Sequence, residues 1–176
     1  MSNSAPRDWK PFLILPRDVR PAAPRDIKTV EGIGDRLRTA AFAEIQARDA
    51  FLWAADRFQD APPGLADAWR KLAADEERHM NSLLRRMTEL GLDVQERGVS
   101  DWLWVSLMTC ESARGFATFM AGAEERGRKA GVRFYETLAQ TDPVSAEIFR
   151  VIAEEEVEHI NLASRFFPEE TQARVE

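Results

Sequence analysis

Apolar side chains recur at steps of three and four residues over most of the chain, which is the spacing of amphipathic α-helices. The first such stretch begins near Asp35 and ends at segment 60–64, which contains two prolines and a glycine. The second runs from Leu65 to Leu90, and Gly91 is a typical residue just after a helix. No stretch shows the alternation that is typical of a strand.

The second half of the chain repeats this arrangement. A third helix includes Phe116 and Met120 and runs to about Ala139, although several glycines weaken its local pattern. Asp142 followed by Pro143 is a capping residue followed by proline at the first helical position. This pair predicts the start of the last helix, which ends before residue 168. The sequence therefore predicts an all-α fold with four main helices.

The first 28 residues contain five prolines, which restrict the backbone and remove hydrogen-bond donors. We expect an extended arm over residues 1–30, a four-helix domain over 31–168 and a short tail over 169–176. The apolar stretch from Trp9 to Leu15 is expected to pack across the domain surface. A partly disordered arm is the alternative interpretation.

Composition narrows the class of protein. The chain has 176 residues, 44% hydrophobic and 31% charged, with a net charge of −6. Without a basic block, nucleic-acid binding is not favoured, and the apolar runs are too short to span a membrane. No signal-peptide pattern is present, and the single Cys110 cannot form an internal disulfide. A reducing cytoplasmic compartment is therefore the simplest expectation.

The two histidines of the chain both close an E-x-x-H motif. A further glutamate lies 32 residues before each motif glutamate, and the whole pattern repeats with an offset of 80 residues. The six residues are Glu44, Glu76, His79, Glu124, Glu156 and His159. Residues three apart share one face of a helix. Each Glu-His pair is therefore a candidate pair of metal ligands.

The motif residues are in line with apolar positions, so they are predicted to point into the core. Glu76 and His79 follow the row of Leu72 and Leu83. A buried carboxylate without a partner is costly, so ion pairs, protonation or metal must stabilise the cluster. Four carboxylates match the charge of two divalent ions, which favours metal. A core of salt-bridged histidines and glutamates is the alternative.

The lengths of the predicted hairpins support the same set. From Glu44 to the end of its helix is about 21 Å, and from Leu65 to Glu76 about 17 Å, so both glutamates reach a similar level. The glutamate of the third helix has rivals in Glu125 and Glu111, but only Glu124 reproduces the 32-residue spacing. Arg48 and Arg126 are the nearest basic residues and are expected at the edge of the site.

Over residues 35–167 the chain resembles the ferritin-like di-iron or di-manganese carboxylate superfamily, in particular its poorly characterised bacterial branch. The segments that carry the resemblance are 43–47, Asp75-Glu76-x-x-His79 and 124–127. The resemblance implies a four-helix bundle in which Glu44, Glu76 and His79 hold one metal ion. It also implies that Glu124, Glu156 and His159 hold the other, with Glu76 and Glu156 bridging.

The resemblance gives roles to two further residues and to one connection. Asp75 and Glu155 would orient the ligand histidines, although both could also be plain surface acids. The superfamily topology requires the second and third helices to run parallel, joined by a crossover. The ten residues 91–100 barely reach across, so part of 101–110 is predicted to belong to the crossover as a short helical piece. A continuous helix from Asp101 would instead indicate a simple up-down bundle.

The function that the resemblance implies is a di-metal protein with two iron ions, or manganese or a mixed Mn/Fe pair. It would act as an oxidase or oxygenase that activates O₂ or peroxide on an unknown substrate, and an external electron donor and a homodimer are both left open. Ferroxidase, peroxide-scavenging or iron-handling chemistry is the alternative, as is a non-enzymatic metal-binding role. A single cysteine excludes a rubredoxin-like Cys₄ module in this chain.

Overall fold

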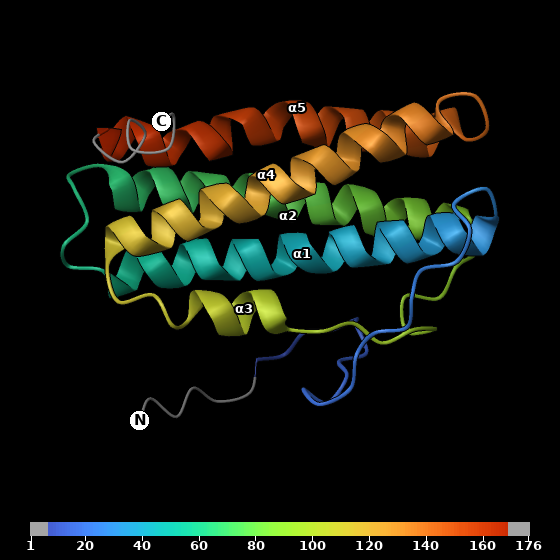
Figure 1. Ribbon diagram of the computed structural model, residues 1–176, viewed down its shortest axis with the longest axis horizontal. Helices are drawn as coiled ribbons and strands as arrows, with labels where there is room; N and C mark the ends of the chain where they lie inside the picture. The colour runs from blue at the N-terminus through green and yellow to red at the C-terminus, as the bar shows by residue number, and fades with distance from the viewer. Residues whose placement is uncertain (1–6, 169–176) are drawn as a thin grey trace, which may run out of the picture.

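The computed structural model describes residues 7–168, and within this range it is all-helical (Figure 1). Its helices are α1 (Val30–Arg57), α2 (Leu65–Glu89), α3 (Trp102–Leu107), α4 (Ala113–Leu138) and α5 (Pro143–Phe166). The described residues form no strand, and the only β-type pairing among them is an isolated bridge between Ile14 and Val99. The predicted all-α class with four long helices is confirmed. No helix in the described range has the length and apolar character needed to cross a membrane.

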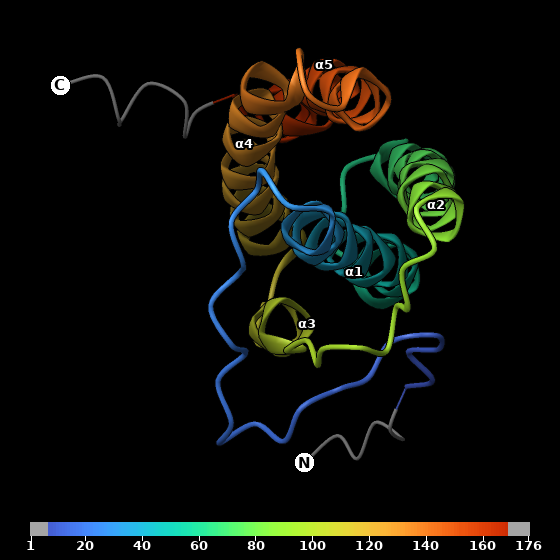
Figure 2. The same cartoon turned by 90° about the vertical axis from the view of Figure 1, so that its right-hand side faces the viewer.

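The four long helices form two antiparallel hairpins, α1 with α2 and α4 with α5 (Figures 1 and 2). The connection between the hairpins, residues 90–112, runs back along the outside of α1 and contains α3. As a result, α2 and α4 point in the same direction along the bundle. The short helical piece predicted within 101–110 is present as α3, and α4 begins only at Ala113.

Helix ends follow the local sequence, with one correction. Helix α1 begins at Val30 instead of near Asp35, because the Thr29 side chain accepts a hydrogen bond from the Gly32 N–H and caps the helix earlier. Gly32 is required by close packing, since a Cβ atom there would lie 1.7 Å from the Asp26 carbonyl oxygen. The predicted end of the second helix at Gly91, which has φ of 68°, is confirmed. The predicted start of the last helix after Asp142, which caps α5, is also confirmed.

The segment from Trp9 to Leu15 packs against α1 and the connection, as predicted. The rings of Trp9 and Phe12 are buried, with centroids 5.7 and 4.9 Å from that of Phe42. The Leu15 N–H donates to the Val99 carbonyl, and the Val99 N–H donates to the Leu13 carbonyl, both at 2.9 Å. The outer parts of the predicted arm and tail, residues 1–6 and 169–176, lie outside the described residues.

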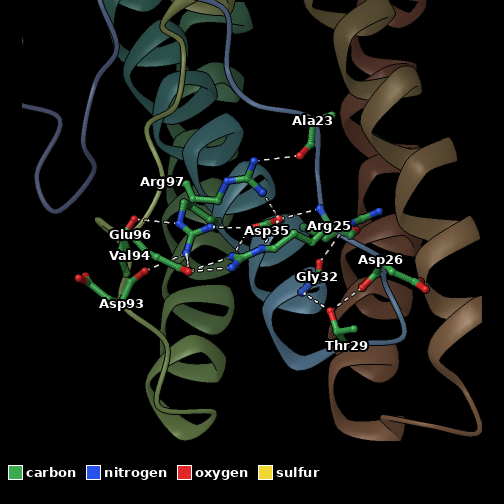
Figure 3. A network of polar contacts seen from close by, with 12 residues as sticks. Ala23, Arg25, Asp26, Thr29, Gly32, Asp35, Asp93, Val94, Glu96 and Arg97 are labelled. Atoms are coloured by element: carbon green, nitrogen blue, oxygen red, sulfur yellow. Dashed lines mark hydrogen bonds and ion pairs between the residues drawn. The ribbon is translucent and has the colours of Figure 1, made fainter.

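A network of charged groups fastens the arm and the connection to the start of α1 (Figure 3). The Asp35 carboxylate accepts hydrogen bonds from the side chains of Arg25, Arg38 and Arg97. Arg25 also binds Glu96, and Arg38 donates to the backbone carbonyl of residue 94 at 2.9 Å. Three segments that are distant in sequence thus share one buried carboxylate. We call these residues, Arg25, Asp35, Arg38, Glu96 and Arg97, the Asp35 network.

Candidate metal centre

All four long helices contribute to a buried polar cluster midway along the bundle. Glu76 and His79 of α2 and Glu156 and His159 of α5 are at most 5% exposed, and Glu44 of α1 and Glu124 of α4 are 8% exposed. The six residues of the repeated motif therefore do come together. We call them the carboxylate–histidine cluster. They divide into two overlapping groups, each with ligand atoms close enough together to hold a metal ion, and the groups share Glu76 and Glu156.

The shared glutamates lie between the two histidines. One oxygen of Glu76 is 3.5 Å from His79 Nδ1 and the other is 2.8 Å from His159 Nδ1. The oxygens of Glu156 are 3.5 Å from His79 Nδ1 and 3.4 Å from His159 Nδ1. Each carboxylate thus presents one oxygen toward each histidine. The imidazole rings are nearly parallel, with centroids 5.8 Å apart.

Most of the polar atoms at the centre of the cluster have no hydrogen-bond partner in the protein. They include both oxygens of Glu76, one oxygen each of Glu124 and Glu156, and Nδ1 of both histidines. Buried polar atoms are rarely left in this state, because each costs free energy comparable to a lost hydrogen bond. Here the unpartnered atoms belong to residues that converge on one volume. The donor set suits a metal ion well, since it offers carboxylate oxygens and imidazole nitrogens.

Without a metal, protons must compensate the crowded carboxylates. Burial, together with the charges of Glu76 and Glu156, raises the pKa of Glu44, and burial and the same neighbours raise the pKa of Glu124. For both histidines burial acts to lower the pKa, but interactions with the nearby carboxylates of Glu156 and Glu76 outweigh it and raise the pKa to about 10. In the absence of metal, the raised pKa values of Glu44, Glu124 and both histidines all favour protonated forms, which reduce the negative charge of the cluster.

A second layer of charge lies where the two motif helices meet. Nε2 of His79 is 2.6 Å from Glu155 of α5, and Nε2 of His159 is 3.8 Å from Asp75 of α2. Each acid thus approaches the histidine of the opposite hairpin, and only the Glu155 contact has hydrogen-bond length. Arg78 joins both acids, at 2.7 Å from Asp75 and 2.8 Å from Glu155. Sequence reasoning missed Arg78, although its place three residues after Asp75 was a usable signal.

The other candidate residues lie away from the cluster. Glu125 is bound to Arg128 and Lys129 on the surface of α4, and Glu111 is exposed. Arg48 pairs with Asp49 and Glu77, so it compensates other acids, and Arg126 is exposed. The spacing argument thus selected the buried glutamate of α4.

A cavity of about 280 Å³ leads from the cluster to the surface between α1, α4 and α5. Glu44, Glu124 and Glu156 line it, whereas Glu76 and both histidines do not. The histidine side of the cluster faces the α2–α5 contact, and the carboxylate side faces the cavity. Any small molecule that enters by this route meets the carboxylates first.

The fold and the cluster define an all-helical protein with a buried carboxylate–histidine site that can hold metal. The family described as "Protein of unknown function (DUF455)" matches residues 1–175, and the chain belongs to this family. No curated protein and no solved structure matches the chain.

Proposed function

We propose that this protein is a ferritin-like di-metal carboxylate protein that binds two iron ions and activates O₂ or peroxide, as an oxidase or oxygenase. The observation that carries the proposal is the set of unpartnered buried oxygens and nitrogens in two overlapping ligand groups. Protein side chains alone leave these atoms unsatisfied, and two divalent ions would satisfy them and balance four carboxylates.

The distances support one assignment of ligands. Glu44, Glu76 and His79 would hold one ion, and Glu124, Glu156 and His159 would hold the other. Glu76 and Glu156 could serve both ions, because each directs one oxygen toward each histidine. Both histidines would use Nδ1, which would leave the Nε2 hydrogen of His79 to be donated to Glu155.

The arrangement of the helices supports the ferritin-like part of the proposal. The two hairpins contribute matching residues at an offset of 80, and α2 and α4 run in the same direction. Each hairpin thus supplies one lone glutamate and one E-x-x-H helix, which is the ligand arrangement of the ferritin-like di-metal proteins.

The composition of the site favours redox-active metals. Four carboxylates and two imidazoles are hard and borderline ligands that suit iron or manganese, and no cysteine lies in the cluster. When bound, the metal pair would supply electrons to O₂ or peroxide and polarise the oxygen atoms. The protein contributes a buried site and fixes the imidazoles. Glu155 orients His79, while Arg78 neutralises the outer acids.

The test begins with metal analysis of protein from iron-supplemented cells, which should give close to two ions per chain. Anaerobic loading with Fe(II) followed by O₂ should consume oxygen and produce the absorbance of an oxidised iron pair. A single stoichiometric oxidation favours an oxygenase that awaits its substrate, whereas continued oxidation of Fe(II) into a mineral core indicates ferroxidase activity. A protein that binds no metal and is equally stable with and without added iron contradicts the proposal.

A further inference from the structure

The cavity beside the carboxylate–histidine cluster is built mainly of small and apolar side chains. Alanines and glycines from α1 and α4 form the sides, and Phe134, Phe149 and Ile152 complete the inner wall. Thr39, Ala43 and Gly127 are exposed, so the cavity is a groove open to solvent along the α1–α4 face. The groove therefore offers an apolar bed with Glu44, Glu124 and Glu156 at its inner end, and Asp35, Arg36 and Arg128 also belong to its lining.

The inner end of the groove carries the polar atoms that point to a ligand. Glu124 is 92% buried, lines the groove and has an oxygen without a hydrogen-bond partner. Glu156 is 97% buried, also lines the groove and also has one oxygen without a hydrogen-bond partner. The ligands on the opposite side, including both histidines, are covered by protein. Open positions on a bound metal pair would thus face the groove.

The groove is long and narrow. Asp35 and Glu44 both line it, and they are nine positions apart, which is about 14 Å of helix. A volume of about 280 Å³ spread over that length has room for one extended hydrocarbon chain. An extended chain advances about 1.2 Å per bond, so about twelve bonded atoms span this length.

The shape arises from the packing of the bundle. Helix α4 runs obliquely to α1 and diverges from it toward the beginning of α1 (Figures 1 and 2). The cavity is lined by residues of both helices. Pro24 of the arm and Leu103 of α3 add to the wall. Both segments are held against α1. Arg25, next to Pro24, binds Asp35. The N–H of Trp104, next to Leu103, donates to Gln46.

We infer that this groove binds a slender, unbranched aliphatic molecule of about ten to twelve atoms, with one end at Glu44, Glu124 and Glu156. The inference rests on the proposed function for the chemistry at that end, where the metal pair would act. The molecule lies along α1 and α4 and is held by burial of its apolar chain. The groove therefore selects by chain length and leaves no room for bulky compounds.

The test uses 1-octanol, an uncharged probe that neither the arginines at the groove nor a metal attracts by charge. Titration into the ¹³C-methyl-labelled protein should shift the methyl signals of Ala40, Ala123 and Ile152. Affinity should rise about threefold per methylene from butanol to octanol, and stop rising once the groove is full. Absence of saturable shifts at these methyl groups overturns the inference.

The variant Gly127→Leu fills the groove, because a Cβ atom at Gly127 meets nothing within 4 Å and the residue lines the groove. Leucine also favours the helix over glycine, so the fold is retained. Octanol affinity should fall by at least about tenfold. The matched control is Gly122→Leu on the same helix, which does not line the groove and should bind octanol as the wild type does.

The metal content of each protein separates the two proposals. Gly127→Leu should retain two ions per chain, and unchanged octanol affinity in this metal-replete variant overturns the groove assignment while the proposed function stands. A wild-type protein that binds octanol in the groove but takes up no metal contradicts the proposed function and leaves the groove assignment in place.

Discussion

Helix α1 contributes one buried carboxylate to each of two clusters, and the clusters differ in whether their polar atoms have hydrogen-bond partners. Asp35 is 5% exposed and Glu44 is 8% exposed, and both line the same cavity. Asp35 accepts hydrogen bonds from three arginines and from the Arg25 backbone N–H, so both of its oxygens are occupied. The carboxylate–histidine cluster instead leaves six oxygens and nitrogens without partners.

The contrast separates a buried carboxylate that the protein itself compensates from buried carboxylates that it leaves uncompensated. A buried carboxylate surrounded by guanidinium groups is complete within the protein, and its removal leaves uncompensated positive charge. Carboxylates that face each other across two imidazoles are incomplete within the protein, and they are stabilised only by protons or by metal. Burial alone does not distinguish the two clusters, whereas the partners of each oxygen do. Substitutions in the Asp35 network should therefore reduce stability and leave metal content unchanged. Substitutions in the carboxylate–histidine cluster should remove metal and leave the protein folded.

The largest expected effect is the loss of metal from the carboxylate–histidine cluster. Glu76→Ala and Glu156→Ala each remove a residue that both ligand groups share, so bound metal should fall from the proposed two ions per chain to almost none. The metal-free variants should remain folded, because the substitution removes a buried charge. Elemental analysis and circular dichroism measure both results. Glu125→Ala on the surface of α4 is the control and should retain both ions, whereas retention of two ions by Glu76→Ala would contradict the comparison.

The next effect is on stability and concerns the Asp35 network. Asp35→Asn leaves the buried Arg38 guanidinium and its neighbours without their shared carboxylate, and should reduce the free energy of unfolding by about 3–5 kcal/mol. Metal content should be unchanged. Urea unfolding of metal-loaded and chelator-treated protein measures the effect, which should be equal in both. A loss of metal without a loss of stability would reverse the roles of the two clusters.

Acid should weaken the same network. Burial acts to raise the pKa of Asp35, but hydrogen bonds from Arg25 and the charges of Arg97 and Arg25 outweigh it and hold this pKa well below its usual range. A folded-state pKa below the unfolded value of about 3.9 means that the stabilisation is complete above about pH 5 and is lost as pH falls further. The stability difference between wild type and Asp35→Asn, measured with chelator, should shrink from pH 7 to pH 3. A constant difference contradicts this expectation.

The smallest expected effects are in the outer acids of the metal centre. Glu155→Gln weakens the contact with His79 and should lower metal affinity by about 10- to 100-fold. Asp75→Asn should have a smaller effect, because Asp75 is 3.8 Å from His159, beyond hydrogen-bond length. Competition with a chromogenic chelator measures both affinities. Equal losses would show that the asymmetry of the two contacts disappears when metal binds.

The helices and the members of the carboxylate–histidine cluster were predictable because both depend on local periodicity. Glu76 and His79 share a face of one helix whatever the surrounding structure, and apolar residues on that face place them inside. Equal spacing of 32 residues in both hairpins was enough to choose Glu124 over Glu125. The start of α1 was predicted too late, since two glycines and an exposed Val30 hide the beginning of the apolar pattern.

Tertiary structure decided what lies around those residues. The contacts of Glu155 with His79 and Arg78 and the contacts of Asp35 with Arg25 and Arg97 join residues from 10 to 77 positions apart in sequence. The groove depends on the angle between α1 and α4 and on an arm and a connection that add to its wall. The sequence by itself determined which side chains form the cluster, because helical repeat and hairpin length are local quantities. Only the packing of distant segments decided which of its atoms are satisfied, which face solvent and where a ligand can enter.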